Sequence, residues 1–128
     1  MKKSKQLTLL GCFLLALFCA CTTTEDPANQ VVAYLNALVN HDANSAVALS
    51  CSDWEDKAKL EADSFLSVGT SLNNVKCQTV RFDDMTAEVS CSGTIEMTYD
   101  NEIRSIDLSL RKYSLKKQAG AWLVCGYQ

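Results

Sequence analysis

Residues 87–99 read Ala-Glu-Val-Ser-Cys-Ser-Gly-Thr-Ile-Glu-Met-Thr-Tyr, and this stretch decides the fold class of the chain. Apolar or small residues occupy every second position, and Glu, Ser or Thr occupies the positions between them. Because successive side chains of a strand point to opposite faces of a sheet, this period of two predicts a long strand with one buried and one solvated face. Asp83-Asp84 before it and Asp100-Asn101 after it supply turn residues.

Two more strands are predicted after this one. The first runs from Ile103 to Lys117, and its apolar residues fall in two groups that simple alternation places on opposite faces: Ile106, Leu108 and Leu110, then Tyr113 and Leu115. A bulge near Arg111-Lys112 would return both groups to the core face. After a turn at residues 118–120, residues 121–127 form the last strand. With the strand that follows Asn73-Asn74, these segments predict an antiparallel sheet of four strands.

The preceding part of the chain has helical spacing. Asp26-Pro27 is typical of an N-cap followed by proline at the first helical position. The apolar residues after it recur every three or four positions: Val31, Tyr34, Leu35 and Leu38. The stretch Asn40-His41-Asp42 interrupts this helix, and Asp42 is predicted to cap a short second helix.

A third helix is predicted from Ser52 onward. Ser52 and Glu55 have the spacing of a capping box. The residues on the apolar face of this helix are Trp54, Ala58, Ala62 and Phe65, and those on its solvated side are Lys57 and Glu61. Helices followed by an antiparallel sheet predict an α+β fold, in which the helices cover one face of a curved sheet.

This order of elements, together with the closing sequence Lys-Gln-Ala-Gly-Ala-Trp-Leu-Val at 117–124, resembles the nuclear transport factor 2-like superfamily. More narrowly, it resembles the small bacterial lipoproteins of that superfamily, and the resemblance covers residues 27–128. It implies a cone of helices and a curved four-stranded sheet around an apolar pocket. Some members are ketosteroid isomerases or dehydratases and others bind ligands or proteins without catalysis, so the fold alone does not choose between these functions.

The first 24 residues indicate where the protein resides. Lys2, Lys3 and Lys5 precede an apolar run of 12 residues from Leu7 to Phe18, which is too short for the roughly 20 residues that cross a bilayer core. The run and the Ala20-Cys21 pair resemble a bacterial lipoprotein signal. This resemblance implies a signal peptide at 1–20, cleavage before Cys21 and a lipidated tether at 21–26, ahead of the single domain at 27–128. The alternative is an ordinary secretory signal with a coincidental cysteine.

The predicted location is the bacterial cell envelope, outside the cytoplasm. Thr22 after Cys21 gives no aspartate-type signal for retention in the inner membrane, so the outer membrane is expected in a host with two membranes. Without the leader, 9 of the 12 basic residues remain against 15 acidic ones, a formal net charge of −6. This balance argues against nucleic acid as a partner and against electrostatic docking on anionic lipid. Acyl chains on Cys21 would therefore hold the protein to the membrane.

Four of the seven cysteines lie in the domain and read as two disulfides. Alternation along the two strands that meet at Asp83-Asp84 puts Cys77 and Cys91 on the same face of the predicted hairpin. A three-residue turn would place them directly opposite each other. Cys51 then pairs with Cys125. These four cysteines lack the short paired spacing that is usual in a zinc site. Reduced, buried cysteines are the remaining alternative to two disulfides.

Few residues are candidates for catalysis, and no catalytic residue, metal or cofactor is predicted. The single histidine, His41, lies in a polar loop, and Asp53, Glu55 and Asp56 are explained by the dipole of a helix start. Six residues could line the pocket that the resemblance implies, although packing in the core explains their spacing more simply: Tyr34, Trp54, Phe65, Met97, Tyr99 and Tyr113.

Three functions are compatible with these features. The leading hypothesis is a membrane-anchored, non-catalytic binding domain whose partner is a small apolar ligand or an envelope protein. The second is an isomerase or dehydratase with Asp63 and Tyr99 as its acid–base pair. The third is a structural envelope component that recognises another protein through an exposed edge or face of the sheet.

Overall fold

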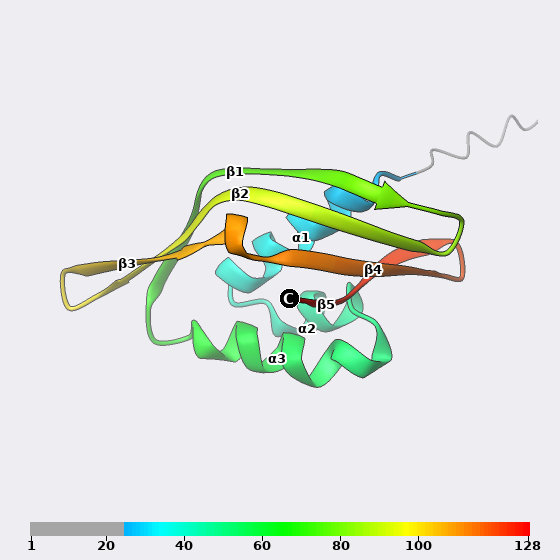
Figure 1. The fold of residues 1–128 in the computed structure, drawn as a ribbon. Coiled ribbons are helices and arrows are strands. Elements are labelled where there is room, and N and C mark those ends of the chain that lie inside the picture. The colour runs from blue at the N-terminus through cyan, green and yellow to red at the C-terminus, as the bar shows by residue number, and fades with distance from the viewer. Residues whose placement is uncertain (1–24) are drawn as a thin grey trace, which may run out of the picture.

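Three helices precede an antiparallel sheet in the computed structural model, which describes residues 25–128. The predicted signal peptide and Cys21 lie outside the described residues. The helices are α1 (Pro27–Val39), α2 (Ala43–Ala48) and α3 (Glu55–Ser64). The strands are β1 (Gly69–Phe82), β2 (Thr86–Tyr99), β3 (Glu102–Asp107), β4 (Lys112–Gln118) and β5 (Ala121–Tyr127). The helices lie together on one side of the sheet (Figure 1), so the predicted α+β class is confirmed.

Both predicted aspartate caps are present. The Asp26 carboxylate accepts a hydrogen bond of 3.0 Å from the backbone N–H of Ala28, and α1 begins at Pro27. The Asp42 carboxylate accepts one of 3.0 Å from the backbone N–H of Ser45. Each cap satisfies a backbone donor that the first helical turn leaves without a partner.

The predicted capping box at Ser52 and Glu55 is wrong. Residues Ser52–Trp54 form a 3-10 turn without a side-chain cap, and α3 begins at Glu55. The reason lies in the preceding residues, which are fixed against β5. Ser50 forms a parallel bridge with Val124, and the N–H of Cys51 donates to the Val124 carbonyl at 2.8 Å. Residues 50–51 are extended alongside β5, so the chain must turn tightly after Cys51 to enter α3.

The sheet has five strands rather than the four predicted, because the segment 103–117 divides in two. Strand β2 pairs with β4 along residues 86–90 and with β3 along residues 94–99. Between β3 and β4, residues Leu108–Leu110 form a 3-10 turn in place of the predicted bulge. This turn buries Leu108 and leaves Leu110 78% exposed, so the core position predicted for Leu110 is wrong. It still returns Tyr113 and Leu115 to the core.

Strand β1 begins five residues earlier than the change of period at Asn74 suggests, because a bulge lies inside it. The pairing with β2 is irregular between Asn73 and Lys76, and Asn74 adopts a φ of 51°. Gly93 lies opposite this bulge with a φ of 91°. A Cβ atom at position 93 would come within 2.5 Å of the Asn74 carbonyl oxygen, so only glycine fits there.

Replacing Gly93 with alanine should therefore destabilise the domain by at least about 2 kcal/mol, since the substitution adds a clash with backbone to an unfavourable φ. Gly69→Ala is the matched control on the neighbouring strand, because its Cβ would meet its nearest atoms at an ordinary 3.8 Å. Urea denaturation of the two variants measures the difference. Equal midpoints would show that the bulge does not constrain Gly93.

The core lies between α1 and the concave face of the sheet. Its largest fully buried side chains are Tyr34, Tyr113, Leu35, Leu38, Ile95, Leu108, Leu115, Val31, Val89 and Val124. The alternation predicted along β2 holds from Ala87 to Ile95 and weakens toward Tyr99, which is exposed where β2 extends beyond the helices. Within residues 25–128, no helix is long and apolar enough to span a membrane.

Candidate functional site: the Glu61 cluster

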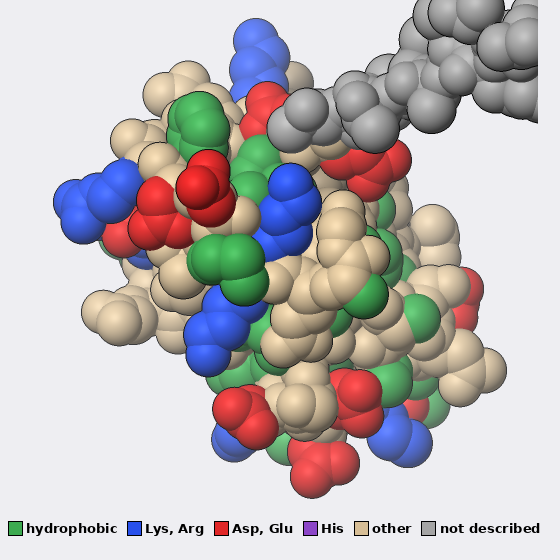
Figure 2. Space-filling model, turned by 90° about the vertical axis from the view of Figure 1, so that its right-hand side faces the viewer, with side chains coloured by type: hydrophobic (Ala, Val, Ile, Leu, Met, Phe, Trp, Pro, Cys, Tyr) green, Lys and Arg blue, Asp and Glu red, His purple; other side chains and the backbone are tan. Residues whose placement is uncertain are grey.

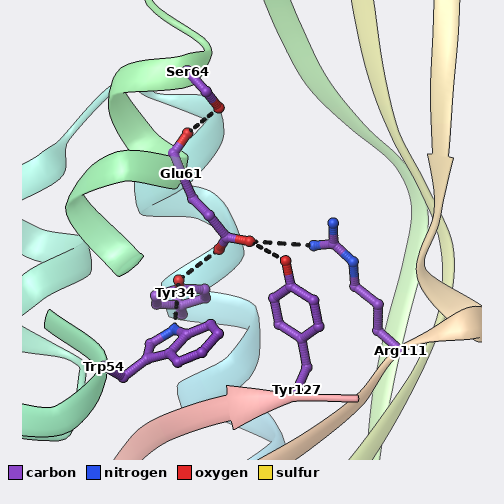
Figure 3. Close-up of polar contacts among 6 residues, drawn as sticks. All are labelled: Tyr34, Trp54, Glu61, Ser64, Arg111 and Tyr127. Carbon is purple, nitrogen blue, oxygen red and sulfur yellow. Dashed lines mark hydrogen bonds and ion pairs between the residues drawn. The ribbon is translucent and has the colours of Figure 1, made fainter. Parts of the chain in front are cut away.

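An acidic side chain on α3 points into the molecule. Glu61, on α3, has a side chain that is only 19% exposed. Its Oε2 accepts a hydrogen bond of 2.7 Å from the hydroxyl of Tyr34, and its Oε1 accepts one from the hydroxyl of Tyr127. Figure 3 shows this carboxylate between the two tyrosines. We name Glu61, Tyr34, Tyr127, Arg111 and Trp54 the Glu61 cluster.

Arg111 completes the charge balance of this cluster. One of its terminal nitrogens lies 3.8 Å from Oε1 of Glu61, and its guanidinium carbon lies 4.1 Å from the centroid of the Tyr127 ring. The Arg111 side chain is also 19% exposed. Because an opposite charge faces Glu61 and the cation stacks on an aromatic ring, the pair is compensated where water is largely excluded.

Aromatic side chains surround the carboxylate. The indole N–H of Trp54 donates to the hydroxyl oxygen of Tyr34 at 3.1 Å, so Tyr34 both donates and accepts. The Tyr127 ring makes edge-to-face contacts with Trp54 and Tyr113, each with centroids 5.5 Å apart. The buried hydroxyl of Tyr113 has no hydrogen-bond partner within residues 25–128.

A bulge in β5 aims Tyr127 at this cluster. Ser114 pairs with Gly126 and Leu115 with Val124, so Cys125 is an extra residue in β5. Simple alternation would put Val124 and Tyr127 on opposite faces, and the extra residue brings both to the inner face. Next to it, Gly126 adopts a φ of 139°, and a Cβ there would lie 3.3 Å from the Trp54 ring. The glycine lets the indole approach the strand.

The surroundings of the two tyrosine hydroxyls favour their neutral forms. Burial raises the pKa of Tyr34, and the nearby Glu61 carboxylate raises it further. Burial and the hydrogen bond to Glu61 raise the pKa of Tyr127 to about 12. Burial also raises the pKa of Tyr113, although Arg111 partly offsets this effect. Tyr34 and Tyr127 therefore hold the protons that they donate to Glu61 throughout the neutral range.

These shifts predict that the folded protein loses stability in alkali. Unfolded tyrosines lose their protons near pH 10, whereas Tyr127 in the folded state keeps its proton up to a pKa of about 12 and Tyr34 also has a raised pKa. Above pH 10 the folded state binds more protons, so the free energy of unfolding should fall by up to roughly 1.4 kcal/mol per pH unit for each tyrosine. Urea denaturation from pH 8 to pH 11.5 measures the slope. The double variant Tyr34→Phe/Tyr127→Phe should show a shallower slope, and an unchanged slope would contradict the assignment.

The six residues predicted to line a pocket do not meet around one cavity. Tyr34, Phe65 and Tyr113 are buried in the core, and Trp54 is half-buried against it. Met97 and Tyr99 instead line a shallow open groove of about 340 Å³ with Val68, Glu102 and Arg104, on the outside of the domain. The six residues thus divide between the core and an outer groove.

The acid–base pair predicted for an enzyme is separated in the structure. The Asp63 carboxylate is 2.5 Å from the ammonium group of Lys59 on the exposed side of α3, and Tyr99 is 61% exposed near the β2–β3 turn. Within residues 25–128, no three His, Cys, Asp or Glu side chains come close enough together to hold a metal ion. His41 is half-buried rather than solvated, and its Nε2 lies 3.0 Å from Oγ1 of Thr70.

The predicted position of Glu61 on the solvated side of the third helix is wrong. The sequence contains a signal for its true position, because Ala58, Glu61, Ala62 and Phe65 follow the i, i+3, i+4, i+7 spacing of one helix face. An acidic residue on an otherwise buried face indicates a partner on the facing elements. The partners Arg111 and Tyr127 could not be found from spacing, since the 3-10 turn and the β5 bulge place them.

The cysteine pairs are those that the sequence predicts. Cys77 lies directly opposite Cys91 and forms a disulfide with it, although a register shift between Thr79 and Arg81, rather than the turn alone, sets this pairing. The second disulfide joins Cys51 to Cys125, the extra residue of the β5 bulge. Two disulfides are typical of proteins in oxidising compartments.

Comparison with known proteins identifies the fold. No protein-family model matches the chain, and no curated protein matches its sequence. Solved structures do match, among them an NTF2-like protein with a cystatin-like fold from Novosphingobium aromaticivorans. That structure has a TM-score of 0.57 and 12% identity over 80% of this chain and 77% of that one. The chain has the nuclear transport factor 2-like fold.

Two further matches show that proteins of different descriptions are similar in structure to this chain. A ketosteroid isomerase-like protein from Erwinia carotovora atroseptica has a TM-score of 0.50 and 19% identity, over 77% of this chain and 88% of that one. A SEC-C motif containing protein from Rhodopseudomonas palustris has a TM-score of 0.56 and 9% identity, over 82% and 79%. At such identities the likeness concerns the fold and leaves function to the site.

Proposed function

We propose that this protein is a lipid-anchored, extracytoplasmic domain that binds another envelope protein and has no catalytic activity. The observation that carries the proposal is the occupied interior. A catalytic cone needs room for a substrate beside a free acid or base. Here Tyr34 and Tyr113 are fully buried, and both oxygens of Glu61 accept hydrogen bonds from tyrosines.

Binding would then use the outer surface, and the β2–β3 hairpin is the region best suited to it. The hairpin projects from one end of the domain (Figure 1), and within residues 25–128 β3 pairs with β2 alone, which leaves its other edge without a strand partner there. Tyr99 and Ile103 near its tip are 61% and 68% exposed. Aromatic and aliphatic side chains beside an open strand edge suit a protein partner.

The anchored location rests on the leader and the disulfides together. The basic start, the apolar run and Ala20-Cys21 have the layout of a lipoprotein signal. The disulfides Cys51–Cys125 and Cys77–Cys91 fit an oxidising compartment outside the cytoplasm. Acyl chains would provide stable attachment without help from the acidic domain.

The lipid anchor is tested by Cys21→Ala, which should abolish labelling by a fatty-acid probe and leave the leader uncleaved by the lipoprotein peptidase. Cys19→Ala is the matched control, because it removes a neighbouring thiol and keeps the acceptor. Cells are grown with the fatty-acid probe, and the protein is then immunoprecipitated and separated by electrophoresis. The gel shows both the labelling of the protein and the cleavage of its leader. Secretion of the unmutated protein in a cleaved, unlabelled form would contradict the proposal.

An isomerase-type enzyme is the second candidate, and the Glu61 cluster favours it over the separated Asp63 and Tyr99. A carboxylate facing tyrosine hydroxyls is a set of groups that can move a proton. A ketosteroid isomerase-like protein is also among the proteins of similar fold. For an enzyme, Glu61→Gln should abolish turnover of a keto steroid by a protein that still unfolds cooperatively, whereas our proposal expects no turnover before or after the change.

A further inference from the structure

The end of the domain that carries the tether also carries exposed apolar side chains. The start of α1, the β1–β2 turn and the β4–β5 turn lie together at the end opposite the β2–β3 hairpin (Figure 1). At the tip of the β1–β2 hairpin, Phe82 is 72% exposed and Met85 is 61% exposed. Phe82 also lines an open groove of about 480 Å³ with Pro27 and Trp122.

Hydrogen bonds fasten the tether to this hairpin. The hydroxyl of Thr79 on β1 donates to the Asp26 carboxylate and accepts from the N–H of Ala28 at 3.2 Å. Asp26 is therefore fixed beside Thr79, which lies three residues before Phe82 on β1. Cys21 lies five residues before Asp26, and five extended residues span at most roughly 18 Å. An acylated Cys21 would thus hold the hairpin tip within reach of the membrane surface.

The charges at this end select the kind of contact. Arg81 on β1 and Lys116 on β4, the two strands that flank β2, line one open groove with Asp83, and Asp84 follows in the turn. Figure 2 looks onto this end and shows acidic, basic and hydrophobic side chains interspersed. The Asp83 carboxylate accepts hydrogen bonds from the N–H groups of Met85 and Thr86, each 2.8 Å long. With both signs of charge present, this end would gain little attraction from an anionic surface, so a membrane contact here would have to be apolar.

We infer that the β1–β2 hairpin is a second membrane contact, in which Phe82 and Met85 enter the interface of the bilayer that holds the anchor. This inference rests on the proposed lipid anchor. It orients the domain with the β1–β2 tip on the membrane and the β2–β3 hairpin directed away from it, toward a partner. A tip that only touches the interface needs little affinity of its own, because the tether keeps its local concentration high.

The test uses the lipidated protein purified from its host and reconstituted in phosphatidylcholine vesicles with brominated acyl chains. Phe82→Trp places a fluorophore at the tip, and Ile103→Trp places one on the opposite hairpin as the matched control; both positions are exposed. Side chains in the interface lie about 5–10 Å into the headgroup and acyl boundary, so the bromines should quench the added fluorescence of Phe82→Trp about twofold. The added fluorescence of Ile103→Trp should not change.

Flotation of the same vesicles separates the two hypotheses. Protein that floats, with quenching at position 82 and none at position 103, supports the inference. Protein that floats with equal quenching at both positions, or with none, overturns the membrane contact and leaves the anchor intact. Protein that does not float overturns the lipid anchor and the membrane contact with it. Binding of the tip to a protein instead of lipid would appear as the second of these outcomes.

Discussion

Replacing Cys51 and Cys125 together with alanine should lower the free energy of unfolding by about 4.5 kcal/mol, the largest effect that we expect from any disulfide in this domain. The two cysteines are 74 residues apart, so the bond removes much of the freedom of the unfolded chain. In the folded state it also fixes Cys51 against the β5 edge, where the chain forms its bridge to Val124. Losing the bond should therefore loosen α3 together with Glu61.

The Cys77→Ala/Cys91→Ala double variant is the matched control for this experiment. Its loop spans 14 residues within one hairpin, and the same entropic relation gives about 3 kcal/mol. Urea denaturation of the two variants beside the unmutated protein measures both losses. A larger loss for the Cys77–Cys91 pair would show that the constraint on the unfolded chain does not set the order of the two effects.

Glu61→Leu should cost about 3 kcal/mol of stability. The substitution leaves the hydroxyls of Tyr34 and Tyr127 without their acceptor and leaves Arg111 without its counter-ion. Each orphaned buried hydroxyl costs roughly 1–3 kcal/mol, and an uncompensated, partly buried cation adds to this. Thermal or chemical denaturation measures the loss.

Two further variants show whether the loss arises from the cluster. Glu61→Gln retains an acceptor oxygen and should recover part of the stability. Asp63 lies on the same helix, and its ion pair with Lys59 is exposed. Asp63→Asn should therefore change the free energy of unfolding by less than about 1 kcal/mol. A Glu61→Leu protein as stable as the Asp63→Asn protein would mean that the Glu61 cluster does not stabilise the fold.

The parts of the fold that follow from local patterns could be predicted from the sequence. The caps at Asp26 and Asp42, the period of two along β2 and the hairpin that joins Cys77 to Cys91 each depend on residues close in sequence. The extra strand could not be predicted in the same way. One 14-residue strand, β2, pairs with two successive partners, and only the whole sheet determines where the first partner ends.

The site was harder to predict because three local irregularities assemble it. The 3-10 turn at residues 108–110 precedes Arg111, the bulge at Cys125 turns Tyr127 inward, and Gly126 makes room for Trp54. Each irregularity is a response to packing between elements distant in sequence. The sequence indicates Tyr34 and Trp54 as candidate lining residues, but the hydrogen bond between them and the one from Tyr34 to Glu61 depend on that packing.

Native mass spectrometry of the protein extracted from its own envelope tests the proposed function most directly. We expect a chain that begins at Cys21, carries the mass of acyl chains on that residue and retains a second protein under gentle ionisation, with no small molecule bound inside the domain. An unlipidated chain would contradict the anchor. A small molecule held in stoichiometric amount would contradict the filled interior and the absence of a substrate site.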